Sequence, residues 1–134
     1  MLAGAVLVLA AGIRFVAAGS DLWLDEVWSL SSVVNVNSSW EVFTVPDSTN
    51  NHLLNTLWLW WGGVDASAYW MRLPSLLLGT GTVALAGLLG ARHGMREGFF
   101  AMLLVAGSYL MIDASSEARG YAPMGFFVLL AWFA

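Results

Sequence analysis

The sequence predicts an all-α integral membrane protein, built as a polytopic helical bundle. Of its 134 residues, 59% are hydrophobic and only 10% are charged, whereas soluble domains carry about 25% charged residues. Several apolar runs approach the roughly 20 residues that a helix needs to cross a bilayer. The eight tryptophans suit the membrane boundary, where an amphipathic ring contacts both water and lipid. These observations favour about four transmembrane helices and an external loop that carries amphipathic interfacial helices.

Charge and composition narrow the possible partners. The net charge of −4 argues against a nucleic-acid partner, because such a partner requires a basic face. The chain has no cysteine, so it forms no disulfide and performs no thiolate chemistry. It also ends inside an apolar run at Ala134. We therefore expect the N-terminal part of a longer protein, inactive by itself.

The first predicted span covers residues 1–19, an apolar run that is interrupted by Arg14. A cleaved signal peptide would begin with a basic region, which this segment lacks, so a membrane anchor is favoured. Arg14 either extends to the lipid headgroups or grips a lipid phosphate, and extension to the headgroups is favoured.

An external loop, predicted over residues 20–72, contains another apolar run at 52–64. This run has only 13 residues and includes Asn55, and runs of that length are more often interfacial than spanning. Its leucines and tryptophans share one helical face, while Asn51 and Asn55 share another. We expect an amphipathic helix that lies in the membrane interface.

The charges between the remaining apolar runs predict the topology. Arg92 and Arg96 cluster in the loop 92–97, which the positive-inside rule places in the cytoplasm. Loop 20–72 and the turn 113–120 then both face outside, so their polar residues can meet at one surface. The apolar runs that this loop and this turn connect are predicted as a second span at 73–91, a third at 98–112 and the start of a fourth at 121–134.

The stretch LWLDEVWSL places Asp25 and Glu26 between tryptophans, just after the first span. A carboxylate held near an apolar surface loses hydration, which raises its pKa and makes it a better general base. The same pair could instead be solvated, or could begin a helix at the positive end of its dipole. The residues themselves favour neither interpretation.

In the stretch PDSTNNHLLN, His52 follows several turn-forming residues. It could bind a metal ion or a phosphate, or transfer a proton, although a plain surface role at a helix start is more frequent. No other His or Cys stands at metal-ligand spacing, because His93 is predicted on the opposite side. We identify no metal ligand, and a bound divalent metal ion stays an open alternative.

The stretch SSEARGYAPM puts Glu117, Arg119 and Tyr121 between two strongly apolar runs. A glycine and a proline within it indicate an irregular turn. Charged groups at membrane depth point to a functional site, and a guanidinium can bind a phosphate through two parallel hydrogen bonds. Arg72, at the mouth of the second span, either joins this phosphate site or extends to the headgroups.

Together, these stretches resemble the N-terminal part of a GT-C type glycosyltransferase, of the family-39 group that is similar to protein O-mannosyltransferases and lipid A aminoarabinose transferases. Members carry an arginine in the first span, then LW-DE, an Asn/His/Pro-rich patch, RLPS, and S-E-A-R-x-Y. The corresponding stretches here are Arg14 with LWLDEVWSL, NNHLLN, MRLPSLLLG and SSEARGYAPM. One departure is that many members read His-Pro-Pro where this chain has Asn51, His52 and Leu53.

The resemblance implies a GT-C-like bundle in a bacterial plasma membrane, with the active site facing outside. The donor would be a sugar on a polyprenyl phosphate, and the acceptor would be a hydroxyl of a glycan, lipid or protein. Transfer would invert the anomeric carbon. The implied roles are general base for Asp25, support for Glu26, donor phosphate binding for Arg72, Arg119 and Tyr121, and site support or acceptor binding for Asn51, His52 and Glu117.

The alternative is a non-catalytic membrane protein, either a transporter subunit or a lipid-binding scaffold. A transporter would be expected to place polar residues in the middle of its spans. Here the polar residues gather at the span ends, which favours chemistry at the membrane surface on a lipid-borne substrate.

Overall fold

The computed structural model describes residues 1–44 and 52–134, and this part of the chain is all-helical, without strands. The prediction of an all-α fold is confirmed. The elements are α1 (Leu2–Ala17), α2 (Leu24–Ser31), the 3-10 turn η1 (Glu41–Phe43), α3 (Leu53–Gly62), α4 (Ala68–Ala91), α5 (Met95–Gly107), α6 (Tyr109–Ser115) and α7 (Tyr121–Phe133).

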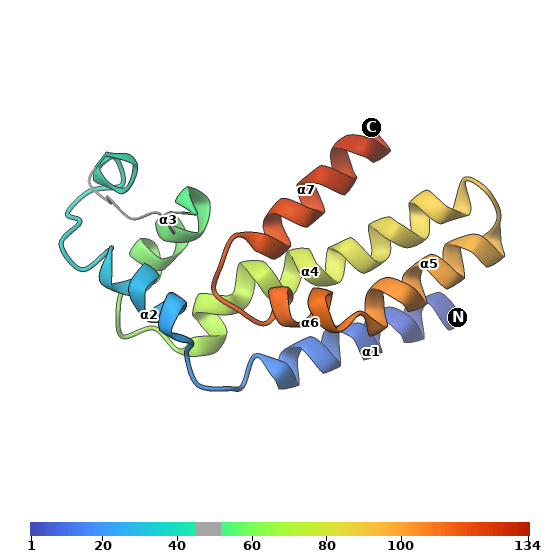
Figure 1. Cartoon of the computed structure of the whole chain (residues 1–134), viewed down its shortest axis with the longest axis horizontal. Coiled ribbons are helices and arrows are strands. Elements are labelled where there is room, and N and C mark those ends of the chain that lie inside the picture. The colour runs from blue at the N-terminus through green and yellow to red at the C-terminus, as the bar shows by residue number, and fades with distance from the viewer. Residues whose placement is uncertain (45–51) are drawn as a thin grey trace.

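Helix α4 is the centre of the fold and contacts α1, α3, α5, α6 and α7 (Figure 1). It begins after Ser67, whose hydroxyl accepts the N–H of Trp70 at 3.3 Å and so caps the first turn. The helix therefore starts five residues before the predicted second span at 73–91. As a consequence, Arg72 lies within the helix and not in a loop ahead of it.

Pro74 explains how α3 attaches to α4. Because proline has no N–H, the carbonyl of Trp70 lacks its helical donor. The indole N–H of Trp58 in α3 donates to this carbonyl at 2.8 Å. The rings of Trp58 and Trp70 also stack, with 4.6 Å between their centroids. Helix α3 is thus anchored at the point where α4 cannot complete its own hydrogen bonding.

The amphipathic helix expected at 52–64 is present as α3, with its polar face turned inward. Asn55 and Thr56 are buried against the protein, whereas Leu54 and Trp61 are 67% and 69% exposed. An apolar face that points away from the protein is typical of a helix that contacts another apolar phase.

Among the described helices, α4 alone has both the length and the apolar composition to cross a membrane. Helix α1, with 16 residues, is about 24 Å long, which is short of the roughly 30 Å hydrocarbon layer. Helices α5 and α6 meet the criterion only as a pair, and they are bent by 63°. The four predicted spans are therefore not confirmed, and the third, at 98–112, is not one straight helix.

A buried arginine accompanies the bend between α5 and α6. The backbone turns at Ser108, where ψ is 116°. Arg14 of α1, which has no exposed surface, donates to the carbonyl of Val105 at 3.3 Å and to the hydroxyl of Ser115 at 3.3 Å. The expectation that Arg14 extends to the headgroups is wrong, because its guanidinium binds groups near the ends of α5 and α6.

Close packing at Gly79 brings α6 against α4. A Cβ added at Gly79 would overlap the Ser115 side chain, so only glycine allows this approach. Small residues at such positions let the backbones of two helices approach closely.

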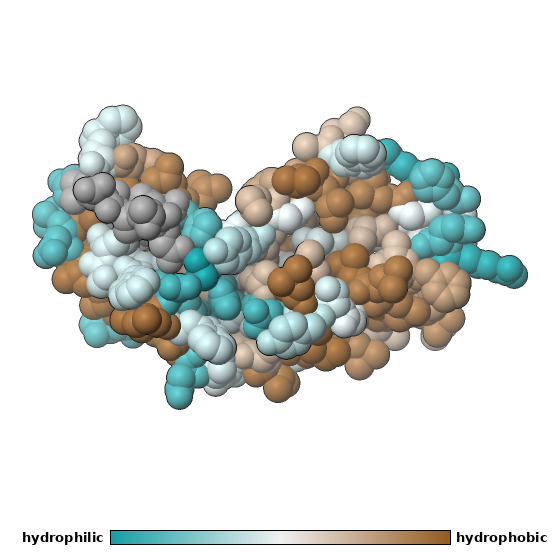
Figure 2. Space-filling model, in the orientation of Figure 1, coloured by the Kyte–Doolittle hydropathy of each residue, from teal (hydrophilic) through white to brown (hydrophobic). Residues whose placement is uncertain are grey.

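Helices α2 and α3 contact the turn 116–120 through hydrogen bonds of Glu26 and Asn55 to Ala118. Helices α2 and α3 lie at the end opposite to the α4–α5 turn (Figure 1). Arg92, which follows α4 directly, places its guanidinium 4.3 Å from the centroid of the Phe133 ring. In the view of Figure 2, hydrophilic residues gather at the end formed by the α4–α5 turn, apolar residues cover much of the bundle beside it, and the end with α2 and α3 shows both kinds.

Candidate functional site

Arg119 is the centre of a polar cluster between α2 and the turn 116–120. Its Nη1 donates to Oδ2 of Asp25 at 2.8 Å and lies 3.8 Å from Oε2 of Glu117. Its guanidinium also lies over the ring of Tyr121, 4.5 Å from the centroid, a cation–π arrangement. Four of the residues singled out from the sequence are therefore brought together.

The two partners of the Asp25–Arg119 ion pair differ in their exposure. The Arg119 side chain is 13% exposed, whereas that of Asp25 is 42% exposed. A shielded guanidinium interacts more strongly with an anion than one in water. The open carboxylate remains accessible to a second molecule that arrives from solvent.

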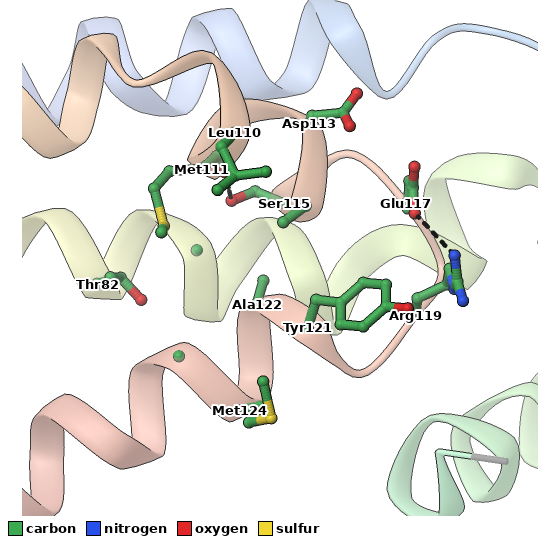
Figure 3. Close-up of a pocket in the computed structure, with 13 residues that line it drawn as sticks. Thr82, Leu110, Met111, Asp113, Ser115, Glu117, Arg119, Tyr121, Ala122 and Met124 are labelled. Atoms are coloured by element: carbon green, nitrogen blue, oxygen red, sulfur yellow. Dashed lines mark hydrogen bonds and ion pairs between the residues drawn. The ribbon is translucent and has the colours of Figure 1, made fainter. Parts of the chain in front are cut away.

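A cavity of about 460 Å³ lies between α4, α6 and α7, and Arg119 lines it. Figure 3 shows Glu117, Arg119 and Tyr121 together on one side of this cavity. Much of the remaining wall is apolar, including Leu110, Met111, Ala122 and Met124. The cavity therefore combines a charged end with an apolar body.

Arg72 and Glu26 form a separate, buried ion pair. Nε and Nη2 of Arg72 donate to the two carboxylate oxygens of Glu26 at 2.9 and 2.6 Å. The remaining donors bind the carbonyls of Ala18, Ser20 and Asp21 at 2.7, 2.7 and 3.0 Å. All five N–H groups of the guanidinium thus have acceptors, and none is left to bind a phosphate in this conformation.

The carboxylate of Glu26 is held in its ionised form. Burial alone would raise the pKa of Glu26, but hydrogen bonds from Arg72, from the N–H of Ala118 and from the N–H of Trp23 lower it further than burial raises it. The two N–H groups lie 2.5 and 2.8 Å from the carboxylate. A carboxylate with a lowered pKa and filled acceptor positions is a poor general base.

Glu117 has the opposite electrostatic environment. Burial raises the pKa of Glu117, and the neighbouring carboxylate of Asp113 raises it further, although Arg119 opposes both effects. Asp113 lines the cavity together with Glu117. Sequence reasoning missed Asp113, although this residue begins the predicted turn 113–120 that also carries Glu117.

His52 stands at the start of α3 and contacts the turn that carries Arg119. Its ring meets Tyr121 edge to face, with 5.0 Å between centroids. A Cβ added at Gly120 would lie 2.8 Å from the imidazole. Burial lowers the pKa of His52, and the charge of Arg119 lowers it further, so the imidazole is neutral near pH 7. Asn51 lies outside the described residues.

No group of three or more His, Asp or Glu side chains that could hold a metal ion occurs in residues 1–44 and 52–134. Comparison of the chain with family models, with curated proteins and with solved structures gives no match. The proposals below therefore depend on the geometry of the site and on the sequence stretches that resemble GT-C enzymes.

Proposed function

We propose that this chain forms part of a membrane glycosyltransferase that moves a sugar from a polyprenyl phosphate to an acceptor hydroxyl. The observation that carries the proposal is the position of Arg119. Its guanidinium lines the charged end of a largely apolar cavity and also pairs with the accessible carboxylate of Asp25 at 2.8 Å. In this arrangement the Arg119 cation can bind a lipid phosphate in the cavity, while the solvent-accessible Asp25 carboxylate lies close enough to accept a proton from the reacting hydroxyl.

The cavity matches the amphiphilic shape of such a donor. Arg119 and Tyr121 would contact the phosphate, and the apolar wall formed by Leu110, Met111 and Met124 would contact the first isoprene units. Large apolar side chains are exposed elsewhere on the helices, including Leu104 at 76% and Val128 at 63%. Such a surface is suited to a lipid environment, from which the donor would enter.

The reaction needs one base and one leaving group. The Asp25 carboxylate takes the proton of the acceptor hydroxyl, and the acceptor oxygen attacks the anomeric carbon from the side opposite the phosphate. The bond between that carbon and the phosphate oxygen breaks, and the polyprenyl phosphate leaves with the electron pair. The configuration of the anomeric carbon inverts. Arg119 stabilises the negative charge that the leaving phosphate gains.

In this proposal Glu26 and Arg72 support the site and do not touch the substrates. Both side chains are nearly fully buried and form an ion pair with each other. Glu117 and His52 shape the surroundings of Arg119, and either could contact the acceptor.

A lipid-binding scaffold is the second candidate, and the same cavity favours it. Such a protein would bind a polyprenyl phosphate through Arg119 without transferring a sugar. The accessible Asp25 beside the cation is the feature that favours the enzyme.

A transfer assay separates these functions. The full-length protein in lipid vesicles would receive polyprenyl phosphates that carry radiolabelled sugars, and label on glycan, lipid and protein fractions would be counted. The enzyme predicts label that leaves the polyprenyl phosphate and appears on an acceptor. Binding of the donor without any transferred label would instead identify the scaffold.

A further inference from the structure

The turn that carries Arg119 is held by side chains from three helices. Glu26 of α2 accepts the N–H of Ala118 at 2.5 Å. Asn55 of α3 donates to the carbonyl of Ala118 at 2.6 Å. Ser75 of α4 donates to the carbonyl of Arg119 at 2.9 Å. Three successive peptide groups around Arg119 are thus each bound by one side chain.

Two of these three side chains have no other evident reason to be polar. Asn55 is 5% exposed and Ser75 is fully buried, and both occupy strongly apolar helices. A buried polar group is costly unless it is hydrogen-bonded. The amide N–H of Asn55 and the hydroxyl of Ser75 each bind a backbone carbonyl of the turn, and the low local dielectric strengthens those bonds.

The orientation of α3 is itself fixed near Asn55. Trp58 lies three residues after Asn55, on the neighbouring turn of the same side of the helix. Its indole N–H binds the Trp70 carbonyl that Pro74 leaves without a helical donor. This contact sets the rotation of α3 and turns the Asn55 amide toward Ala118.

We propose that Asn55 and Ser75 are positioning residues that hold the backbone of the turn so that Arg119 reaches both Asp25 and the cavity. This inference rests on the proposed function for the role of Arg119 as phosphate ligand. Whether Asn55 and Ser75 stabilise the turn can be measured without a ligand. This inference and the proposed function can therefore fail independently of each other.

The test uses the full-length protein with two disruptive variants and two references. Asn55→Leu keeps the branched shape of the side chain and removes the donor, and Ser75→Ala removes the hydroxyl. Ser75→Thr keeps the hydroxyl and serves as the conservative rescue. Ser29→Ala is the matched control, because Ser29 is also buried but donates to a carbonyl of its own helix, that of Asp25 at 2.9 Å.

The first readout is the rate of trypsin cleavage after Arg119 in the ligand-free protein. Cleavage requires local opening of the turn. Loss of one buried hydrogen bond should raise the rate roughly tenfold in Asn55→Leu and in Ser75→Ala. Ser29→Ala and Ser75→Thr should be cleaved at close to the wild-type rate.

The second readout is affinity for undecaprenyl phosphate in nanodiscs, measured as double-mutant cycles with Arg119→Ala. If Asn55 and Ser75 act through Arg119, their substitution weakens binding about tenfold in the wild-type background and has little effect once Arg119 is absent. A general structural defect would weaken binding equally in both backgrounds.

Wild-type cleavage rates in both disruptive variants would overturn the inference, as would affinity losses that persist without Arg119. If the wild-type protein does not bind undecaprenyl phosphate at all, the proposed function is wrong. In that case the cleavage rates alone decide whether Asn55 and Ser75 hold the turn.

Discussion

The guanidinium of Arg72 and the carboxylate of Glu26 satisfy each other through two hydrogen bonds of 2.9 and 2.6 Å, with side-chain exposures of 0% and 1%. The two residues are 46 positions apart, and their pair ties α2 to the start of α4. Because Glu26 also binds Ala118 at 2.5 Å, the pair reaches the turn that carries Arg119.

Arg72→Lys should destabilise the protein although it keeps the charge. A lysine has three N–H donors for five acceptors, so at least two buried acceptors lose their partners. Each costs about 1–3 kcal/mol, which predicts a loss of about 2–6 kcal/mol in the free energy of unfolding. Chemical denaturation in detergent, followed by tryptophan fluorescence, measures this loss. The exposed Arg92, changed to Lys, should stay within about 0.5 kcal/mol of wild type, and an equal effect at both sites would contradict the account.

Glu26 and Glu117 should affect stability with opposite pH dependence. The pKa of Glu26 is lowered in the folded state, so its ionised form stabilises the protein above the ordinary value of 4.5, and this is lost as the pH falls through the lowered pKa. Glu26→Gln should therefore be most destabilising at neutral pH, with a smaller difference below pH 4.5.

The pKa of Glu117 is raised, so its ionised form opposes folding at neutral pH. Glu117→Gln should therefore increase stability at pH 7. The gain should shrink as the pH falls through the raised pKa, and it should vanish below about 4.5. Denaturation curves between pH 4 and 8 compare both variants with wild type. If both variants changed the free energy of unfolding in the same direction at pH 7, the two carboxylates would not have the opposite environments described here.

Trp58→Phe should lower stability more where Pro74 is present than where Pro74 is replaced. The variant removes the indole N–H that binds the Trp70 carbonyl at 2.8 Å, at a cost of about 1 kcal/mol. In a Pro74→Ala background the backbone N–H of residue 74 can bind that carbonyl instead. The cost of Trp58→Phe should therefore be smaller there, as a denaturation double-mutant cycle would measure. An unchanged cost would mean that ring stacking alone attaches α3.

Asp25→Asn should reduce sugar transfer by about 10²–10⁴, the usual effect of removing a positioned base. Affinity for the donor lipid should stay close to wild type, because Asp25 does not line the cavity described for the donor. Asp65→Asn, an exposed change before α4, is the matched control and should leave transfer intact. Transfer at the wild-type rate in Asp25→Asn would remove the base assignment.

Hydropathy and local signals predicted the helices better than they predicted the contacts. Apolar runs located α1, α4, α5 and α7, and the short length of 52–64 predicted α3 as a separate helix. The bend at Ser108 was missed, because the surrounding run is apolar on both sides and carries no proline. The start of α4 was placed too late, since its first turn contains polar and aromatic residues that resemble a loop.

For the site, residues that are close in sequence were the easier part. Glu117, Arg119 and Tyr121 were grouped because one turn carries them. Which carboxylate pairs with which arginine depended on contacts that form only in the folded chain. Arg119 pairs with Asp25, 94 positions away, and Arg72 pairs with Glu26 and not with a phosphate site. Asn55 and Ser75 were visible as polar residues inside apolar runs, but their acceptors on the turn were not.

The central claim is that Arg119 binds the phosphate of a lipid-linked sugar, and affinity for undecaprenyl phosphate tests it most directly. Lysine keeps a positive charge but loses the planar fork that binds phosphate through two hydrogen bonds. We predict weaker binding in Arg119→Lys than in wild type, and much weaker binding in Arg119→Ala, with unfolding curves that still show a folded bundle. Purified full-length variants in nanodiscs would be compared. Equal affinity of the wild-type, Lys and Ala forms would contradict the account and assign Arg119 to membrane placement.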